Sequence, residues 1–183
     1  PAVTVRLDVM EANIARVQSR LASLGVANRP HIKTHKIPAL AKLQMQAGAV
    51  GITCQKLGEV EVFADAGVAD DVLLAFNIVG ETKTDRLMEL SSRLKRLAVV
   101  LDNDVVAKGL SEAGQRHGRD VPFLIECDTG MGRNGVQTPQ AALDLARATM
   151  RMPRMQFEGL MTFPCRFPSS HDFFAEAPRL FER

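Results

Sequence analysis

The sequence predicts an α/β protein of the (β/α)8 barrel class, with about six of the eight strand-helix units present in its 183 residues. Short, nearly continuous apolar segments alternate with amphipathic helical patterns, which is typical of a buried parallel sheet covered by helices. Polar residues follow most of these apolar segments, at the positions where a barrel assembles its active site. Because the chain has no internal repeat, linker or low-complexity segment, we expect one partial barrel domain over residues 1–183.

The first predicted element is an N-terminal helix. Its apolar residues recur at alternating spacings of three and four, a period that only a helix places on one face. These residues are Leu7, Met10, Ile14, Val17, Leu21 and Leu24. Asp8 and Glu11 resemble a capping box at the start of this helix, and Gly25 is its expected stop.

The first predicted strand covers residues 29–33 and is followed by a loop and a helix, which Pro38 opens and Gly48 closes. The same order recurs five more times, with strand candidates at residues 49–54, 72–77, 97–102, 121–128 and 157–163. The helical patterns between them begin at residues such as Asp104, Thr138 and Pro139 and end at residues such as Gly67, Gly118 and Pro153.

A doubly wound open sheet is the alternative to a barrel. No glycine-rich dinucleotide-binding motif follows any predicted strand, which removes the main reason to prefer the open sheet. Polar residues stand instead at the carboxyl ends of the predicted strands, namely Lys33, Thr53, Asn77, Asp102, Asp128 and Thr162. Because a barrel gathers such positions around one mouth, we favour the barrel.

The composition of the chain indicates which kind of molecule it binds. The formal net charge of +2 is small and basic residues are interspersed with acidic ones, which argues against nucleic acid or an anionic membrane and favours a small molecule. No apolar run approaches the roughly 18 residues that span a bilayer, and no signal-peptide pattern opens the chain.

The three cysteines, Cys54, Cys127 and Cys165, are expected to be reduced thiols, so we predict a cytoplasmic protein. Pro1 and Arg183 look like cut ends, so we expect a fragment.

Lys33 is the first candidate for a reactive residue. In the predicted strand it alternates with Ile32 and His31, so if Ile32 packs outward the other two side chains point into the barrel. Desolvation there would favour the free amine, which is the form that attacks an aldehyde. The alternative is an ordinary strand-end lysine that reaches solvent, and position alone leaves both interpretations open. Lys36, in the following loop, and Lys42, on the next helix, are weaker candidates.

The second candidate is the glycine-containing loop after residues 121–128. Its glycines, Gly130, Gly132 and Gly135, permit backbone angles and close approaches that other residues resist. Arg133, held by such a loop at a barrel mouth, would be a fixed donor to a phenolate or carboxylate oxygen. A tight turn with a solvent-facing arginine is the alternative. The loop is not a Walker phosphate site, because no Lys-Ser or Lys-Thr pair follows its last glycine.

Together the two segments resemble a known family. Residues 29–36, Arg-Pro-His-Ile-Lys-Thr-His-Lys, are similar to the cofactor-lysine motif of D-threonine aldolases and D-serine dehydratases, which are fold-type III enzymes that use pyridoxal 5'-phosphate (PLP). Residues 128–136, Asp-Thr-Gly-Met-Gly-Arg-Asn-Gly-Val, are similar to a strand-end motif that this group shares with alanine racemases. Residues 11–14, 51–59 and 159–162 also resemble the family, so the resemblance covers nearly the whole chain.

The resemblance implies an alanine-racemase-type barrel and a PLP-dependent lyase for D-β-hydroxy-amino acids. Lys33 would bind PLP covalently and act as a base at the substrate α-carbon, while Arg133 would bind the cofactor's phenolic oxygen. His31 and Thr53 are further candidates for cofactor binding. The leading reaction is retro-aldol cleavage to glycine and an aldehyde, as in D-threonine aldolase. Dehydration as in D-serine dehydratase, racemisation and non-catalytic PLP binding are the alternatives.

The resemblance also implies sites outside this chain. In the family, phosphate-binding loops come from later strands, and the ligands of a divalent metal come from a C-terminal β domain. We therefore expect the isolated chain to be a poor catalyst and the full-length enzyme to be a homodimer. Residues 163–167 depart from the family pattern, with phenylalanine where aromatic hydroxyls often occur, and the chain contains no tyrosine. The resemblance therefore does not extend to a tyrosine acid or base.

Overall fold

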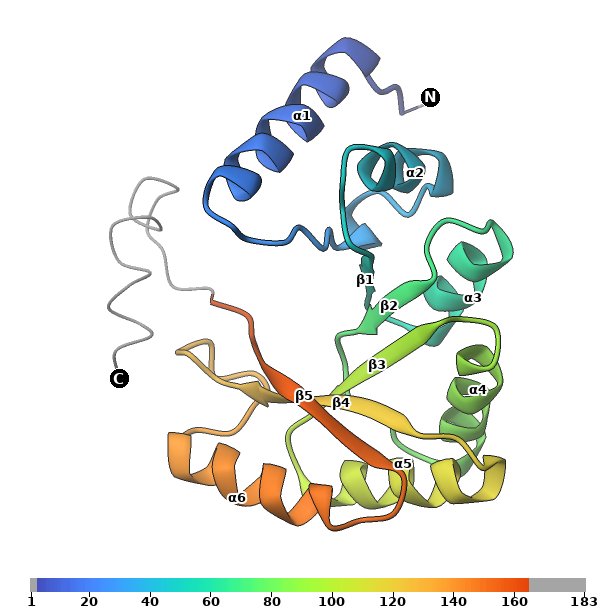
Figure 1. The fold of residues 1–183 in the computed structure, drawn as a ribbon, viewed down its shortest axis with the longest axis vertical. Helices are drawn as coiled ribbons and strands as arrows, with labels where there is room; N and C mark the ends of the chain where they lie inside the picture. Colours follow the sequence, from blue (N-terminus) through green and yellow to red (C-terminus); the bar gives the residue numbers. More distant parts are fainter. Residues whose placement is uncertain (1–2, 165–183) are drawn as a thin grey trace. The chain divides into compact units, whose positions relative to one another are not determined.

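The computed structural model describes residues 3–164, in which strands and helices alternate (Figure 1). The helices are α1 (Leu7–Ser23), α2 (Pro38–Gln46), α3 (Leu57–Asp65), α4 (Glu81–Ser91), α5 (Asp104–His117) and α6 (Pro139–Met150), with a short 3-10 helix η1 (Ile32–Thr34) before α2. The strands are β1 (Ile52–Cys54), β2 (Asp71–Leu74), β3 (Arg96–Leu101), β4 (Val121–Cys127) and β5 (Met155–Thr162). Within this part of the chain, no helix is long and apolar enough to cross a membrane.

The chain divides into two compact units. Among the described residues, the first unit comprises residues 3–76 and 80–99, and the second comprises residues 77–79 and 100–164. Strand β3 begins in the first unit and ends in the second. The strands follow the order β1-β2-β3-β4-β5, which is their order in the chain. A (β/α)8 barrel has this order, whereas a doubly wound sheet changes direction, so the barrel prediction is the better of the two.

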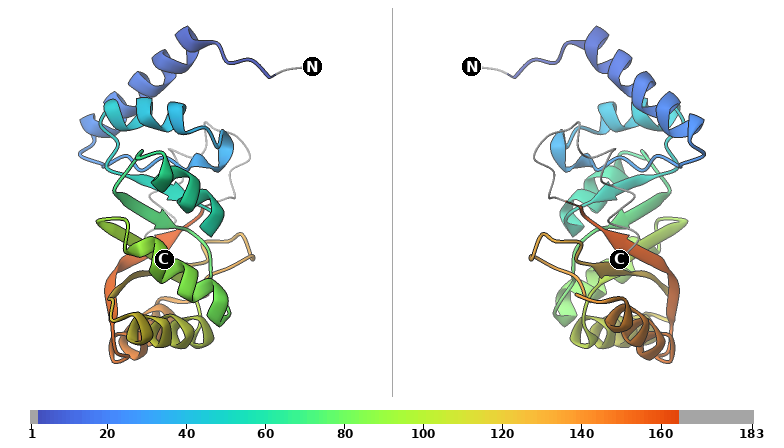
Figure 2. Two further views of the ribbon diagram at one scale, coloured as in Figure 1. Left: turned by 90° about the vertical axis from the view of Figure 1, so that its right-hand side faces the viewer. Right: turned by 90° about the vertical axis from the view of Figure 1, so that its left-hand side faces the viewer.

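In the first unit, β1 pairs in parallel with β2, and β2 pairs in parallel with β3. All three residues of β1 are buried, and Val60 and Phe63 of α3 are buried as well. Helices α3 and α4 lie side by side, and α3 contacts both β1 and β2 (Figure 2). A parallel sheet with a fully buried first strand therefore forms where the sequence predicts one.

A half-buried ion pair ties the segment before η1 to this sheet. Arg29 donates to both carboxylate oxygens of Asp71, at 3.0 and 2.9 Å, and Arg96 donates to one of them at 2.6 Å. Burial alone would raise the pKa of Asp71, but the hydrogen bonds from the two guanidinium groups hold it below its usual range. Gly51 lies against this pair, because a Cβ there would be 2.2 Å from Arg29 Nη1.

In the second unit, β4 and β5 pair in parallel along their length, with a bulge between Phe123 and Leu124. The rings of Phe123 and Phe157 contact each other across the two strands, with centroids 5.6 Å apart. Helices α5 and α6 lie next to each other and both contact β4 and β5 (Figures 1 and 2). The side chains of Asn103 and Thr138 cap α5 and α6 by accepting backbone N–H bonds from Val106 and Ala141, at 3.0 and 3.1 Å.

The predicted helix signals are confirmed in most places. Gly25, Gly48, Gly67 and Gly118 have positive φ just beyond the ends of α1, α2, α3 and α5. The predicted capping box of α1 is wrong: the N-cap is Arg6, which makes no side-chain cap. Asp8 is already inside the helix, and its carboxylate accepts hydrogen bonds from Arg6 instead. No residue of α1 is fully buried.

The predicted first strand, residues 29–33, is also wrong in extent. It is reduced to one parallel bridge between His31 and Thr53, and the chain then turns into η1. The reason is local, because the ring of His31 accepts a hydrogen bond from the backbone N–H of Lys33 and so favours a turn over further strand pairing. The other five predicted strands are present with shifted ends.

Gly51 offers a test of the packing in the first unit. We expect Gly51→Ala to lower stability by about 2 kcal/mol, because a Cβ there would also lie 2.4 Å from the Asp71 carbonyl oxygen, which is backbone and cannot easily move. Thermal unfolding followed by circular dichroism would measure the change. Gly109→Ala is the control, since Gly109 lies inside α5 with open space around the added Cβ and should gain about 0.5 to 1 kcal/mol. Equal effects at the two sites would contradict the close approach.

Candidate active site

The first candidate site is built on the turn from His31 to Thr34. The backbone N–H of Thr53 donates to the carbonyl of Pro30 at 2.8 Å, which fixes the start of the turn against β1. Ile32 is fully buried, whereas His31 and Lys33 are half-buried. The side chains of His31 and Lys33 therefore lie apart from that of Ile32, as the predicted alternation requires, although the backbone is a turn rather than a strand.

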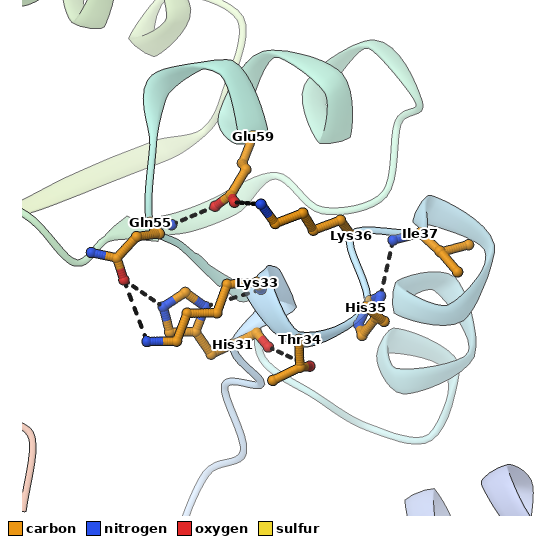
Figure 3. A network of polar contacts seen from close by, with 8 residues as sticks. All are labelled: His31, Lys33, Thr34, His35, Lys36, Ile37, Gln55 and Glu59. Carbon is orange, nitrogen blue, oxygen red and sulfur yellow. Dashed lines mark hydrogen bonds and ion pairs between the residues drawn. The ribbon is translucent and has the colours of Figure 1, made fainter. Parts of the chain in front are cut away.

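Gln55 joins these two side chains (Figure 3). Its side-chain oxygen Oε1 lies 3.5 Å from Lys33 Nζ, which donates to it, and 3.3 Å from His31 Nε2. The backbone N–H of Gln55 donates to Glu59 at 2.7 Å, and its side-chain amide donates to the carbonyl of Ala75 at 3.4 Å. Gln55 is thus held by α3 and by the chain beyond β2, and in turn it orients the Lys33 amine.

The hydrogen bonds of His31 assign its tautomer. Nδ1 accepts from the backbone N–H of Lys33 at 3.3 Å, so the proton of the neutral ring is on Nε2, which donates to Gln55 Oε1. Burial lowers the pKa of His31, and the positive charge of Lys33 lowers it further. His31 is therefore a neutral donor beside the lysine at neutral pH.

The other lysines of this region have different surroundings. Lys36 has a positive φ of 54°, and its Nζ lies 3.3 Å from Glu59 Oε1 (Figure 3). The Glu59 carboxylate is nearly buried, with 10% of its side chain exposed, and Lys36 is the cation beside it. Lys42 is exposed on α2. Of the three lysines weighed from the sequence, Lys33 is the one that lies against both Gln55 and His31.

Two polar residues, Thr53 and Gln55, lie at the end of β1. Thr53 was predicted as a strand-end site residue, and the structure places it buried inside β1, bridged to His31. Gln55 is the first residue past the observed end of β1, so it is the polar strand-end residue here. The position of Gln55 directly after the apolar residues of this strand is the signal in the sequence that could have identified it. Buried Cys54, between them, is a free thiol whose pKa is raised to about 12 by burial and then by the charge of Glu59.

The second candidate site, in the second unit, is the loop after β4. The Asp128 carboxylate accepts hydrogen bonds from the backbone N–H groups of Gly130, Met131 and Gly132, at 2.9, 2.8 and 2.9 Å. These bonds, with that from Gly130 first, lower the pKa of Asp128. A parallel bridge between Cys127 and Val136 closes the loop. The predicted glycine-rich loop is therefore a tightly folded backbone structure.

Arg133 lies near the tip of this loop and is exposed. Its guanidinium carbon is 5.3 Å from the centroid of the Phe163 ring, within the range of a cation–π contact. The neighbouring Asn134 donates to Glu126 at 3.5 Å, and Glu126 is 3% exposed. Burial raises the pKa of Glu126, against the hydrogen bond from Asn134. Arg133 is therefore held beside an aromatic ring and close to a buried carboxyl group.

The structure thus brings His31, Lys33 and Thr53 together in the first unit and places Arg133 on the folded loop of the second. Within residues 3–164, no group of three or more histidine, cysteine, aspartate or glutamate side chains could hold a metal ion. Cys54 and Cys127 are free thiols, while the predicted thiol Cys165 lies outside the described residues.

Comparison with known proteins gives a consistent group of relatives. Residues 5–183 match the family described as alanine racemase, N-terminal domain. The chain is 34% identical to 3-hydroxy-D-aspartate aldolase of Paracoccus denitrificans over 91% of this chain and 43% of the relative. It is 35% identical to D-threo-3-hydroxyaspartate dehydratase of Delftia sp. over 88% of this chain and 42% of the relative.

A solved structure agrees with these relatives. The crystal structure of D-threonine aldolase from Filomicrobium marinum is similar with a TM-score of 0.84 and 38% identity, covering 87% of this chain and 43% of that one. The chain therefore spans less than half the length of the relatives that it matches.

The lowered pKa of His31 predicts a pH dependence of stability. Because the folded pKa lies below the ordinary value of 6.5, the unfolded chain takes up this proton first as the pH falls. The stabilising contribution of neutral His31 is therefore complete above pH 6.5 and decreases below it. We expect the thermal midpoint to fall less between pH 7.5 and pH 5.5 in His31→Gln than in the unmodified protein. Identical falls would show that His31 is not buried as a neutral ring.

Proposed function

This chain belongs to the alanine racemase N-terminal domain family, and from this premise we propose that it is the cofactor-binding part of a PLP-dependent lyase. Lys33 is the proposed cofactor lysine, and D-β-hydroxy-amino acids are the proposed substrates. The observation that carries the proposal is the placement of the Lys33 amine, half-buried and directed at Gln55 Oε1 beside a neutral histidine. On this proposal, residues 1–183 form part of a PLP-binding barrel domain.

Each of the two units offers a group whose chemistry suits this cofactor. PLP requires an amine that reacts with its aldehyde and a donor for its anionic phenolic oxygen. Lys33 provides the amine, and Arg133, on a loop fixed by Asp128, provides a planar cationic donor. His31 and Thr53 are proposed as further cofactor contacts. When bound, the cofactor delocalises negative charge that develops at the substrate α-carbon.

Lys33 Nζ is the proposed group for proton transfer at the substrate α-carbon. It would accept the α-proton in dehydration and would donate a proton to the α-carbon after aldol cleavage. As a free amine it can take up a proton, and its ammonium form donates to Gln55 Oε1, so one contact serves both states. His31 supports this role by remaining neutral, because a second positive charge beside Lys33 would repel the ammonium form. Gln55 keeps the two nitrogens at one oxygen, and the chain therefore presents the amine in a fixed direction.

Retro-aldol cleavage is the leading reaction, supported by the similarity to two aldolases. The similarity to a dehydratase of nearly the same identity and coverage supports dehydration as the second candidate. The reactions differ in the bond that breaks, which is Cα–Cβ in the aldol cleavage and Cβ–O in the dehydration. The homodimer, the divalent metal and the cytoplasmic location remain predictions from the sequence, and we assign no residue of this chain to the metal.

Substitution of the lysine tests the proposed role directly. In the full-length protein, we expect Lys33→Ala to lower the turnover of D-threonine by at least about a thousandfold, because no other residue would supply the reacting amine. Glycine release measures turnover, and circular dichroism checks that the fold is kept. Lys42→Ala is the matched control, since Lys42 is exposed on α2 and should keep full activity. If Lys33→Ala retained more than about a tenth of the activity, the assignment would be wrong.

Product analysis separates the two candidate reactions. An aldolase should convert D-threonine to glycine and acetaldehyde, whereas a dehydratase should convert D-serine to pyruvate and ammonia. We expect glycine from D-threonine with the full-length protein. Pyruvate from D-serine without glycine from D-threonine would replace the aldolase proposal by the dehydratase one. A protein that binds PLP but leaves both substrates unchanged would contradict the lyase proposal.

A further inference from the structure

The loop that carries Arg133 is anchored at a second point, away from Asp128. Asp102 is the first residue beyond β3 and is half-buried. One of its carboxylate oxygens, Oδ2, accepts a hydrogen bond from the backbone N–H of Gly135 at 2.9 Å. The other, Oδ1, accepts from the side-chain amides of Asn77 and Asn103, at 2.8 and 2.7 Å. Asp102 therefore links the segment after β3 to the far end of the loop.

Gly135 is suited to this contact because its backbone approaches the end of β4 very closely. It has a φ of +102°, and a Cβ there would lie 2.5 Å from the backbone nitrogen of Asp128. Only a glycine fits such a position, and its backbone N–H group donates to Asp102. The two carboxylates bind different parts of the loop backbone. Asp128 accepts from the N–H groups of residues 130–132, and Asp102 accepts from that of residue 135. Arg133 and Asn134 lie between the two anchors.

We propose that Asp102 is a positioning residue for Arg133, acting through the backbone N–H of Gly135. This inference rests on the proposed function for the role of Arg133 in cofactor binding, but the anchoring itself rests on the contacts within the second unit. Arg133 has five N–H donors in a rigid fork on a flexible stem, so the position of its backbone limits which oxygen the fork can reach. Asp102 fixes the backbone at one end of the loop, and Asp128 fixes it at the other.

The hydrogen bonding of Asp102 makes an isosteric substitution informative. Its three partners among residues 3–164 are all N–H donors, so both of its oxygens accept. In Asp102→Asn, either orientation of the amide directs NH2 at a donor, at Gly135 or at Asn77 and Asn103. The substitution therefore breaks the anchor while hardly changing side-chain volume. Asp120→Asn is the matched control, because Asp120 precedes the other end of β4 and accepts from Arg154 and Gln156 instead.

Limited trypsin digestion of the full-length protein tests the anchor without reference to activity. Arg133 is exposed, and cleavage after it requires the loop to open. We expect Asp102→Asn to raise the cleavage rate at this bond roughly tenfold, as loss of a charge-assisted hydrogen bond predicts, and Asp120→Asn to leave it unchanged. If Asp102→Asn does not fold, Asn77→Ala, which removes one donor from Asp102, should raise the rate by a smaller factor. An unchanged cleavage rate in the folded variant would overturn the inference.

A double-mutant cycle on PLP affinity then tests whether the anchor acts through Arg133. We expect Asp102→Asn and Arg133→Ala each to weaken PLP binding roughly tenfold, and the double variant to be no weaker than Arg133→Ala alone. Additive losses would overturn the positioning role, since they would mean that Asp102 acts independently of Arg133. If the unmodified protein does not bind PLP, the proposed function fails, and the cleavage rate alone decides whether Asp102 positions Arg133.

Discussion

Two nitrogens of one short turn, His31 Nε2 and Lys33 Nζ, are directed at a single oxygen atom, Oε1 of Gln55. The candidate site depends on this shared acceptor, because it gives a flexible lysine a defined direction and keeps the histidine in one tautomer. Gln55 is itself fixed from both sides, by Glu59 at the start of α3 and by the carbonyl of Ala75 after β2. Hydrogen bonds through Gln55 thus connect the Lys33 amine to the chain beyond β2 in the first unit.

The second unit uses backbone rather than side-chain packing to present Arg133. Two carboxylates, those of Asp128 and Asp102, accept four backbone N–H groups of one loop, and glycine at position 135 permits the loop to lie against β4. A buried carboxyl group, that of Glu126, accepts a hydrogen bond from Asn134 of the loop. Both candidate sites therefore consist of a cationic side chain on a short segment whose backbone is held at several points.

The sequence alone predicted the parallel sheet, the order of its elements and the ends of most helices, because apolar periodicity and glycine stops report local conformation. It predicted Lys33 and Arg133 as candidates for the same reason, since each stands in a recognisable local pattern. It missed Gln55 and the role of Asp102, because their importance comes from contacts with residues 22 and 33 positions away. It also predicted a strand through Lys33, where a hydrogen bond to His31 favours a turn.

We propose that Lys33, and no other lysine of this region, reacts with the cofactor. Borohydride reduction of the PLP-loaded full-length protein, followed by peptide mapping with mass spectrometry, tests it most directly because reduction makes the bond between amine and cofactor permanent. We expect the pyridoxyl group on Lys33. A pyridoxyl group on Lys36, which is paired with Glu59, or on the exposed Lys42 would contradict it.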